Sequence, residues 1–401
     1  MNREQEGGTN RGSDISILTE VPMLITPLYE DHASGTMKEN QSTVRATSDN
    51  SIEDNRTHCA NRRHYTSMLS SDARASAIER GILGLYRRYT LQSLQRRNWH
   101  ADTCVDWKAL GANHSDAVHT VVEGFFAVEQ YTPDYVAPLI IRLRQSYGRS
   151  QWHIRWGAEE QRHADLWRNT VVALGRRDEA WIDKYTASLR QRDWRLPWES
   201  PLHMVFYQVI QERATQVSYL NLAQAVLGKL QRLETPFDAT LGQVCHLIAA
   251  DEAAHYHFFV EVARLLLYYE PQKAIPAFLE VLRRFSMPAR DIIDDYDTFG
   301  KTLHESGIFG RTIYYREVVQ TALDALTISS IREAEHALSR ASDVTSTDQE
   351  LSTLLDIVNL PVLEQNVRHL FLRNQNHLEK TGLAHLFASP WQPAWHIENP
   401  S

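Results

Sequence analysis

Two short stretches of the chain each place a glutamate three residues before a histidine, Glu160 with His163 and Glu252 with His255. On an α-helix, residues three apart lie on one face with about 5–6 Å between their Cβ atoms, so each pair can reach one point in space. A surface ion pair explains one such pair, but two pairs favour a shared site. The chain must therefore fold so that at least two helices bring these faces together.

The chain from Arg74 onward contains long helical segments and few strand signals. Ser115 is a plausible helix N-cap, and Ser200 with Pro201 forms a second helix start. Pro133 predicts a kink in the helix that begins at Ser115. Long helices of this kind suit a helical bundle. We predict four of them over residues 115–145, 148–174, 201–228 and 236–269, and shorter ones over 272–286, 311–342 and 347–378.

Each of the four long helices carries a carboxylate on the face that is otherwise apolar. A buried carboxylate is costly unless it is paired or binds a metal. One glutamate from each of two helices, plus Glu-x-x-His from each of the other two, is the arrangement of ferritin-like di-iron and di-manganese proteins. We therefore predict an all-α, ferritin-like helical bundle with a di-iron centre in a four-helix core and additional helices around it. The predicted metal ligands are Glu129, Glu160, His163, Glu212, Glu252 and His255.

Residues beside these ligands have two readings each. Arg162 and Asp251 either hold ligands in place or form ordinary ion pairs, and the sequence does not decide between the two. Thr215, one turn after Glu212, either presents a hydroxyl to the metals or bonds back to its own helix. Glu123 and Glu159 fall off the ligand face, so we expect them at the surface or supporting the ligands.

The composition limits the class of protein. The 401 residues are 43% hydrophobic and 23% charged, which is typical of a globular chain, and the formal charge of −8 argues against nucleic-acid binding. No apolar run is long enough for a membrane span. We expect a mostly disordered N-terminal extension over residues 1–72, one domain over 73–378 and a C-terminal tail over 379–401. The first residues lack the pattern of a secretory signal, so we expect a cytoplasmic location, with the plastid stroma as the alternative.

Five stretches around these residues resemble motifs of one family, the soluble acyl-carrier-protein desaturases typified by the plant stearoyl enzymes. The stretch "AEEQRHAD" resembles the family's first Glu-x-x-His block and "IAADEAAH" its second. The stretches "VEQYTPDY" and "QERATQVSYLNLAQ" are similar to the two segments with a lone glutamate, and "FSMPAR" to a downstream signature. The resemblance covers roughly residues 76–310 and continues more weakly to about 376.

The resemblance implies the same six ligands, two iron ions, dioxygen as co-substrate, an acyl carrier protein as partner and a homodimer. Thr215 falls on a threonine associated with oxygen activation, and Trp99 and Asp251 fall on positions implicated in electron transfer toward His163. Tyr219 departs from the family pattern on the channel side of its helix, which leaves the substrate and its carrier open. The acidic carrier needs a basic surface, for which we consider Arg87, Arg88, Arg96, Arg97, Arg283, Arg284 and Arg290.

The leading functional hypothesis is an oxygen-dependent desaturase that acts on an acyl chain carried as a thioester, most simply on acyl carrier protein. The alternative is a di-iron hydroxylase or N-oxygenase of a specialised biosynthetic pathway. Iron storage fits the ligands but not the length or the desaturase-type motifs. The radical-generating subunit of ribonucleotide reductase is disfavoured because Trp167 stands where that family has its radical tyrosine. The sequence has no cysteine cluster and no dinucleotide fingerprint, so we expect electrons from a ferredoxin-type protein.

Overall fold

A computed structural model describes Thr66 and residues 69–230, 232–342 and 347–386, all of which belong to one unit of the chain, 60–401. The described residues are mainly helical and contain no β-strand, only an isolated bridge between Ile328 and Val358. The all-α prediction is confirmed. Most of the predicted extension, 1–72, and of the predicted tail, 379–401, lies outside the described residues. Within them, no helix is long and apolar enough to cross a membrane.

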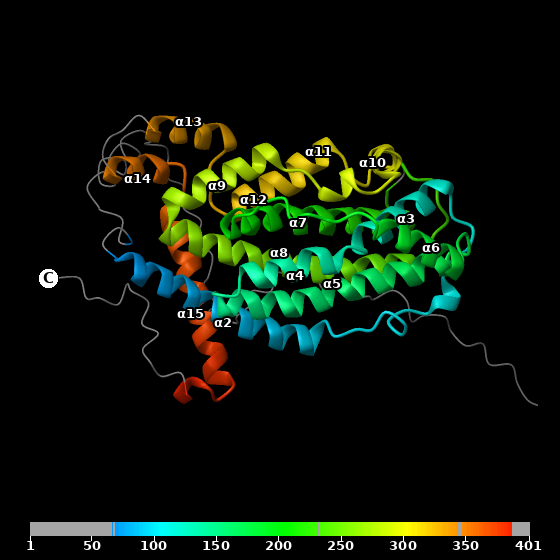
Figure 1. Cartoon of the computed structure of the whole chain (residues 1–401), viewed down its shortest axis with the longest axis horizontal. Helices are drawn as coiled ribbons and strands as arrows, with labels where there is room; N and C mark the ends of the chain where they lie inside the picture. Colours follow the sequence, from blue (N-terminus) through cyan, green and yellow to red (C-terminus); the bar gives the residue numbers. More distant parts are fainter. Residues whose placement is uncertain (1–65, 67–68, 231, 343–346, 387–401) are drawn as a thin grey trace, which may run out of the picture. The chain divides into compact units, whose positions relative to one another are not determined.

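Four long helices form the bundle that the sequence predicts (Figure 1). α7 packs along α8, α3 packs along α5, and α5 packs against α8. α7 is buried on all sides over residues 204–210 and α8 over residues 258–263, and the four helices together supply about half of the buried apolar residues in the described part of the chain. The ferritin-like architecture is confirmed. The four helices are α3 (Asp116–Glu129), α5 (Tyr147–Ala173), α7 (Pro201–Val226) and α8 (Ala239–Tyr269).

The helix predicted over residues 115–145 is not one kinked helix but two. α3 ends at Glu129, and α4 begins at Thr132 and runs to Arg142. Pro133 stands in the first turn of α4, where its missing N–H is not needed and its ring meets no preceding turn. The break leaves Glu129 as the last residue of α3 and lays α4 along α5.

Additional helices surround the bundle (Figure 1). α2 (Ser71–Arg96) packs on α5 and α8, and α15 (Leu360–Lys380) packs on α2 and α8. α9 (Pro271–Arg284) packs on α7 and α8, and α13 (Ile331–Ser342) and α14 (Thr347–Leu355) pack on α9. The remaining elements are α6 (Glu179–Leu189), α10 (Tyr296–Glu305), α11 (Arg311–Ile313), a π-helical turn (Tyr314–Val319), α12 (Gln320–Ala325) and 3₁₀ turns at Trp107–Ala109, Pro288–Asp291 and Ala384–Leu386.

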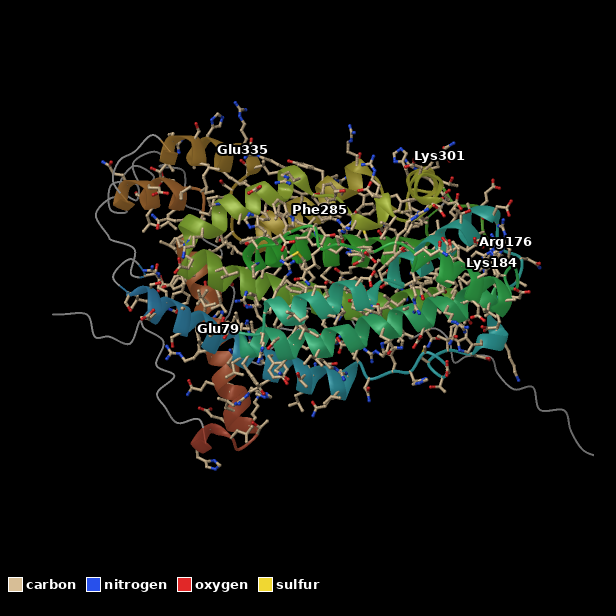
Figure 2. All side chains as sticks on the ribbon, viewed as in Figure 1. Glu79, Arg176, Lys184, Phe285, Lys301 and Glu335 are labelled. Carbon is tan, nitrogen blue, oxygen red and sulfur yellow. The ribbon has the colours of Figure 1, made fainter. Side chains whose placement is uncertain are left out.

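The apolar core of the described residues consists of two clusters. One uses Trp152 and Trp156 of α5 with the α8 residues after Tyr256, and the other uses Leu166 and Trp167 of α5 with the α8 residues before Ala249. The segments between these positions carry the two Glu-x-x-His pairs. A polar layer therefore divides the core inside the bundle, while charged side chains such as Lys301 and Glu335 project outward (Figure 2).

Candidate metal centre

All six predicted ligands lie inside the bundle. Their exposed fractions are at most 6%, and both histidines are fully buried. α5 supplies Glu160 and His163, and α8 supplies Glu252 and His255, because residues three apart share one face of a helix. Glu129 comes from the end of α3 and Glu212 from the middle of α7. Four carboxylates buried together require a compensating positive charge.

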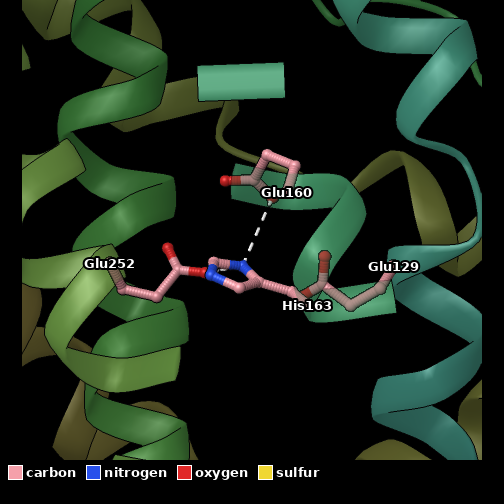
Figure 3. A group of neighbouring side chains, drawn as sticks. All are labelled: Glu129, Glu160, His163 and Glu252. Atoms are coloured by element: carbon pink, nitrogen blue, oxygen red, sulfur yellow. Dashed lines mark ion pairs between the residues drawn. The ribbon is translucent and has the colours of Figure 1, made fainter. Parts of the chain in front are cut away.

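The six side chains form two overlapping groups. In one group, Glu129 and His163 converge with Glu160 and Glu252, and in the other Glu212 and His255 converge with the same two glutamates. Within each group the ligand atoms lie within 4.8 Å of one another. Figure 3 shows the first group, with its residues reaching inward from α3, α5 and α8. Glu160 and Glu252 are therefore placed to bridge two cations, and each other residue is placed to bind one.

The hydrogen bonding inside the described bundle leaves ligand atoms free. Glu160 Oε1, His163 Nδ1 and His255 Nδ1 are buried without a hydrogen-bond partner. His163 Nδ1 faces Glu252 Oε1 at 3.3 Å, and His255 Nδ1 faces Glu160 Oε1 at 3.1 Å. Such buried orphan atoms are rare in proteins, and a metal ion satisfies them. The donor set therefore fits two divalent cations, whose charge balances that of four carboxylates.

A carboxylate holds the far side of each histidine ring. Asp251 Oδ2 lies 3.3 Å from His163 Nε2, and Glu159 Oε2 lies 3.0 Å from His255 Nε2. A carboxylate at Nε2 keeps the proton there and leaves the Nδ1 lone pair for a metal. Asp251 and Glu159 each stand directly before the glutamate of a Glu-x-x-His pair, and each holds the histidine of the other helix. The arrangement is thus crossed between α5 and α8.

The crossed carboxylates are themselves held by arginines and hydroxyls of α2, of its C-cap and of α5. Arg97 lies 2.7 Å from Asp251, and Arg162 lies 2.9 Å from the same carboxylate. Glu159 accepts hydrogen bonds from Tyr89, from Ser93 and, at 3.0 Å, from Arg155. Arg97, one of the residues considered for the carrier-binding surface, forms this ion pair with a buried carboxylate. The sequence left Arg162 and Asp251 open between holding ligands and forming an ordinary ion pair, and the contact of Asp251 with His163 favours the first reading.

The sequence left Glu159 open between a surface position and a position supporting the ligands, and the contact with His255 corresponds to the second. Glu159 is fully buried and contacts a ligand histidine. It precedes Glu160 as Asp251 precedes Glu252, so the repeated unit is an acid followed by Glu-x-x-His. The position of Glu159 beside the ligand face of α5 did not decide between the two alternatives, because the neighbouring helices that cover this side cannot be identified from the local sequence. Glu123, by contrast, pairs with Arg177 at 2.8 Å, away from the metal site.

Trp99 and Thr215 both lie against the ligands. The indole of Trp99 stacks on the imidazole of His163, with ring centroids 6.2 Å apart and planes 12° apart, and Arg162 covers the Trp99 ring at 4.5 Å. The single hydroxyl hydrogen of Thr215 has three acceptors within reach, the carbonyls of Gln211 and Glu212 and, at 2.9 Å, Glu252 Oε2. The geometry is therefore compatible with either reading of Thr215, and the hydroxyl adjoins a predicted ligand in both.

Two tyrosine hydroxyls contact ligand carboxylates. Tyr219 of α7 donates a hydrogen bond to Glu129 Oε1. Tyr135 of α4 donates to Glu160 Oε2 at 3.3 Å. Neither contact was predicted, because tyrosine on an apolar helix face is ordinary core packing until the partner helix is known. The departure at Tyr219 therefore bears directly on a predicted ligand.

The electrostatics of the cluster agree with a site for cations. Burial raises the pKa of Glu129 to about 8, and the neighbouring Glu160 adds to this rise. Burial and then Glu252 raise the pKa of Glu212 well above its ordinary value. Burial also acts to raise the pKa of Glu252, but His163 and His255 together outweigh it and lower this pKa. Two carboxylates are thus driven to keep a proton unless a stronger positive charge replaces it.

A cavity adjoins the cluster on the side of α4 and the first half of α7. Its walls include the ligands Glu129, Glu160, Glu212 and Glu252, together with side chains from α4, α5, α7 and the segment that joins α6 to α7. Water-sized molecules have about 60 Å³ of space for their centres in it. Thr215 lies in its wall. A small substrate segment can therefore reach the ligands from this side only through a narrow space.

Comparisons with known proteins agree with this site. The family model described as fatty acid desaturase matches residues 101–366. Stearoyl-acyl-carrier-protein 9-desaturase 1 of Arabidopsis thaliana, described as chloroplastic, is 27% identical over 245 residues, which cover 57% of this chain and 60% of that protein. Acyl-carrier-protein desaturase 6 of Oryza sativa subsp. japonica, also described as chloroplastic, is 33% identical over 147 residues, covering 36% of this chain and 34% of the relative.

Solved structures give a weaker likeness. DesA2 of Mycobacterium tuberculosis superposes with a TM-score of 0.43 and 21% identity, covering 62% of this chain and 94% of that one. A superposition at this level adds nothing to the family match, which covers more than half of the chain. The matched part of this chain also spans less than two thirds of the curated relatives. On the family match, with all its predicted ligands converging inside one bundle, the chain belongs to the fatty acid desaturase family.

Proposed function

We propose that this protein is an oxygen-dependent desaturase that introduces a double bond into an acyl chain carried as a thioester. The observation that supports it is the pair of overlapping ligand groups beside a narrow cavity. Acyl carrier protein is the proposed carrier, since the relatives are named for acyl-carrier-protein substrates. A homodimer, and a cytoplasmic or plastid location, belong to the same proposal through the family resemblance.

The residues that would hold the metals follow from the two groups. Glu129 and His163 would bind one iron, Glu212 and His255 the other, and Glu160 and Glu252 would bridge them. Two bound ferrous ions would supply the reducing power that activates dioxygen to oxidise unactivated carbon. Asp251 and Glu159 orient the two imidazoles and hold the proton at Nε2.

The cavity has the task of positioning the substrate. Its walls run from the ligands along α4 and α7, so a chain lying in it has one short segment beside the metal site. Holding that segment in place converts a random encounter into an oriented one and keeps water away from the reacting carbons. The Thr215 hydroxyl, bonded to Glu252 at the cavity wall, is placed to hold a proton at the point where substrate and ligands meet.

Electrons have to come from another protein. Desaturation with dioxygen takes up two electrons from outside, and the three cysteines of this chain form no cluster for a redox centre. A ferredoxin-type donor is therefore part of the proposal. Trp99 is partly exposed and stacks on His163, whose Nε2 contacts Asp251, so this stack is the proposed entry path.

Product analysis tests the proposal. The iron-loaded protein receives ferredoxin, its reductase, NADPH and a panel of acyl thioesters, and the products are weighed by mass spectrometry. A product lighter by two hydrogens supports desaturation, and NADPH without ferredoxin should give none. No oxidised product with any thioester would contradict the proposal.

A hydroxylase or N-oxygenase is the second candidate. The specific observation in its favour is that the cavity wall carries several polar side chains, among them Gln208, Gln211 and Tyr207, where a hydrocarbon channel needs none. A product heavier by one oxygen in the same experiment would assign the protein to this class instead.

A further inference from the structure

Two residues that line the cavity carry a buried hydrogen-bond donor that has no partner in the described structure. Gln208 lies one turn before Glu212 on α7, lines the cavity and is 3% exposed. Trp156 lies one turn before Glu160 on α5, lines the same cavity and is 5% exposed. In the part of the chain that the structure describes, nothing accepts a hydrogen bond from Gln208 Nε2 or Trp156 Nε1. The Cβ atom of each residue therefore lies roughly 5–6 Å from the Cβ atom of a predicted ligand one helical turn away.

A third residue backs Gln208. His153 is 1% exposed, and its Nδ1 lies 2.7 Å from the carbonyl of Arg149, so its proton sits on that nitrogen. Burial lowers the pKa of His153 to about 4 and outweighs a side-chain contact with Gln208 that acts to raise it, so the ring stays neutral. That contact does not meet hydrogen-bond geometry at His153 Nε2 or Gln208 Nε2, and within the described residues both nitrogens are left without a hydrogen-bond partner. The group formed by Gln208, Trp156 and His153 is thus polar, uncharged and incompletely bonded.

Such a group does not suit a plain hydrocarbon. A buried donor that loses its water and gains no partner destabilises the state in which it is buried, and methylene groups accept no hydrogen bond. Apolar side chains such as Met204 and Leu139 line the same cavity, so an apolar wall was structurally available at these positions. The donors become favourable once a bound molecule presents an oxygen to them.

We propose that the substrate carries a hydrogen-bond-accepting oxygen close to the carbons that are oxidised, and that Gln208 and Trp156 donate to it. This inference rests on the proposed function and narrows its substrate class. The oxygen is either a hydroxyl or keto substituent on the acyl chain, or the thioester carbonyl of a chain oxidised near its carboxyl end. An anionic group is disfavoured because the facing residues are neutral.

The test measures binding to the full-length, iron-loaded protein without an electron donor, so that nothing reacts. The probes are acyl-pantetheine thioesters of equal length, one saturated and the others with a single keto group at different positions, plus a short saturated thioester. We expect one keto position to bind roughly tenfold tighter or more than the saturated chain. If instead the short saturated thioester binds more tightly than the long saturated thioester, the oxygen is the thioester carbonyl.

Three variants identify the cause of the preference. Gln208→Leu should reduce the affinity ratio of the keto chain to the saturated chain to about one, while the saturated chain binds as well as before. Trp156→Phe should reduce this ratio in part. Met204→Leu is the matched control, since it alters an apolar residue of the same wall, and should leave the ratio intact. Trp156→Phe also keeps the test decisive if Gln208→Leu does not fold.

Two results would overturn the inference. One is that every keto chain and the short chain bind with the same affinity as the saturated chain. A cavity water bonded to both donors would give this result. The other is an equal loss for saturated and keto chains in Gln208→Leu. These outcomes differ from failure of the proposed function, in which no thioester is oxidised under electron supply. Oxidation of the saturated chain without any binding preference contradicts only this inference.

Discussion

At the predicted metal site, the orientation of each buried histidine is fixed by other charged residues. His163 and His255 each have one nitrogen held by a carboxylate and one left for a metal. The holding carboxylates are in turn held by arginines and hydroxyls. Removing a holding carboxylate should therefore loosen the metal rather than unfold the bundle, because the apolar clusters on both sides stay intact.

Glu159→Gln and Asp251→Asn test this expectation. Each should weaken iron binding roughly 10–100-fold, as the loss of a group that orients a ligand histidine usually does. The measurement is iron retention in competition with a chelator, with circular dichroism as the check on folding. Glu123→Gln is the control, because Glu123 forms an ion pair away from the ligands. Unchanged iron retention in both variants would show that the crossed contacts are not needed.

The neutral His153 makes a separate prediction about pH. Its pKa falls from an ordinary 6.5 to about 4 in the folded state, chiefly through burial. Between these values the unfolded chain binds a proton that the folded chain does not, so stability is lost as the pH falls through this window. The loss is at most about 3 kcal/mol. Denaturant unfolding at several pH values should show a shallower decline for His153→Gln than for the unaltered protein, and parallel curves would contradict it.

Contacts between elements depend on glycines where helices approach closely. At Gly148, near the start of α5, a Cβ atom would lie 2.9 Å from the backbone nitrogen of Leu83 and 3.0 Å from the carbonyl carbon of Ile82 in α2. Backbone atoms cannot move aside as a flexible side chain can. Gly300 in α10 has nothing within 4 Å of the same position. Alanine substitution at Gly148 therefore tests the close packing of α2 on α5, whereas the same substitution at Gly300 tests helix propensity alone.

Gly148→Ala and Gly300→Ala should change stability in opposite directions. The first forces α2 away from α5 and should lower the free energy of unfolding by about 1–3 kcal/mol. The second replaces a partly exposed helical glycine by the best helix former and should raise that free energy by roughly 0.5–1 kcal/mol. Urea unfolding of both variants measures the difference. A stable Gly148→Ala variant would mean that the two helices have room to separate.

For the molecule as a whole, the sequence located most of the bundle, and the six residues it predicts as ligands converge inside it. It did so because the ligand pattern and the apolar faces are local features with helical spacing. The break after Glu129 was predicted only as a kink, since a proline marks a discontinuity without fixing its angle. Glu159, Tyr219 and the unbonded Gln208 acquire their meaning from other helices, so one chain segment at a time could not reveal them.

The boundary of the folded unit gives a prediction at the same scale. Thr66 Oγ1 donates to the carbonyl of Tyr268 at 3.2 Å, and Ser70 caps α2 by accepting from Ala73 N at 3.2 Å. A chain starting at residue 66 should keep the thermal midpoint and the iron content, as expected if the first residues form an extension. A chain starting at residue 73 should lose about 1–2 kcal/mol, mainly through the missing cap. Thermal unfolding of the two truncations compares them, and a large loss in the longer one would show that the extension packs on the bundle.

The crossed carboxylates also fix how far α5 is shifted along α8. Sliding one helix along the other by a single turn, about 5.4 Å, would separate Asp251 from His163 and Glu159 from His255 together, leaving two carboxylates stranded in the interior. Any misaligned pairing of these helices therefore costs free energy at both carboxylates, even before a metal binds. The protein can therefore align α5 and α8 during folding, so that the two histidines are in position before iron binds.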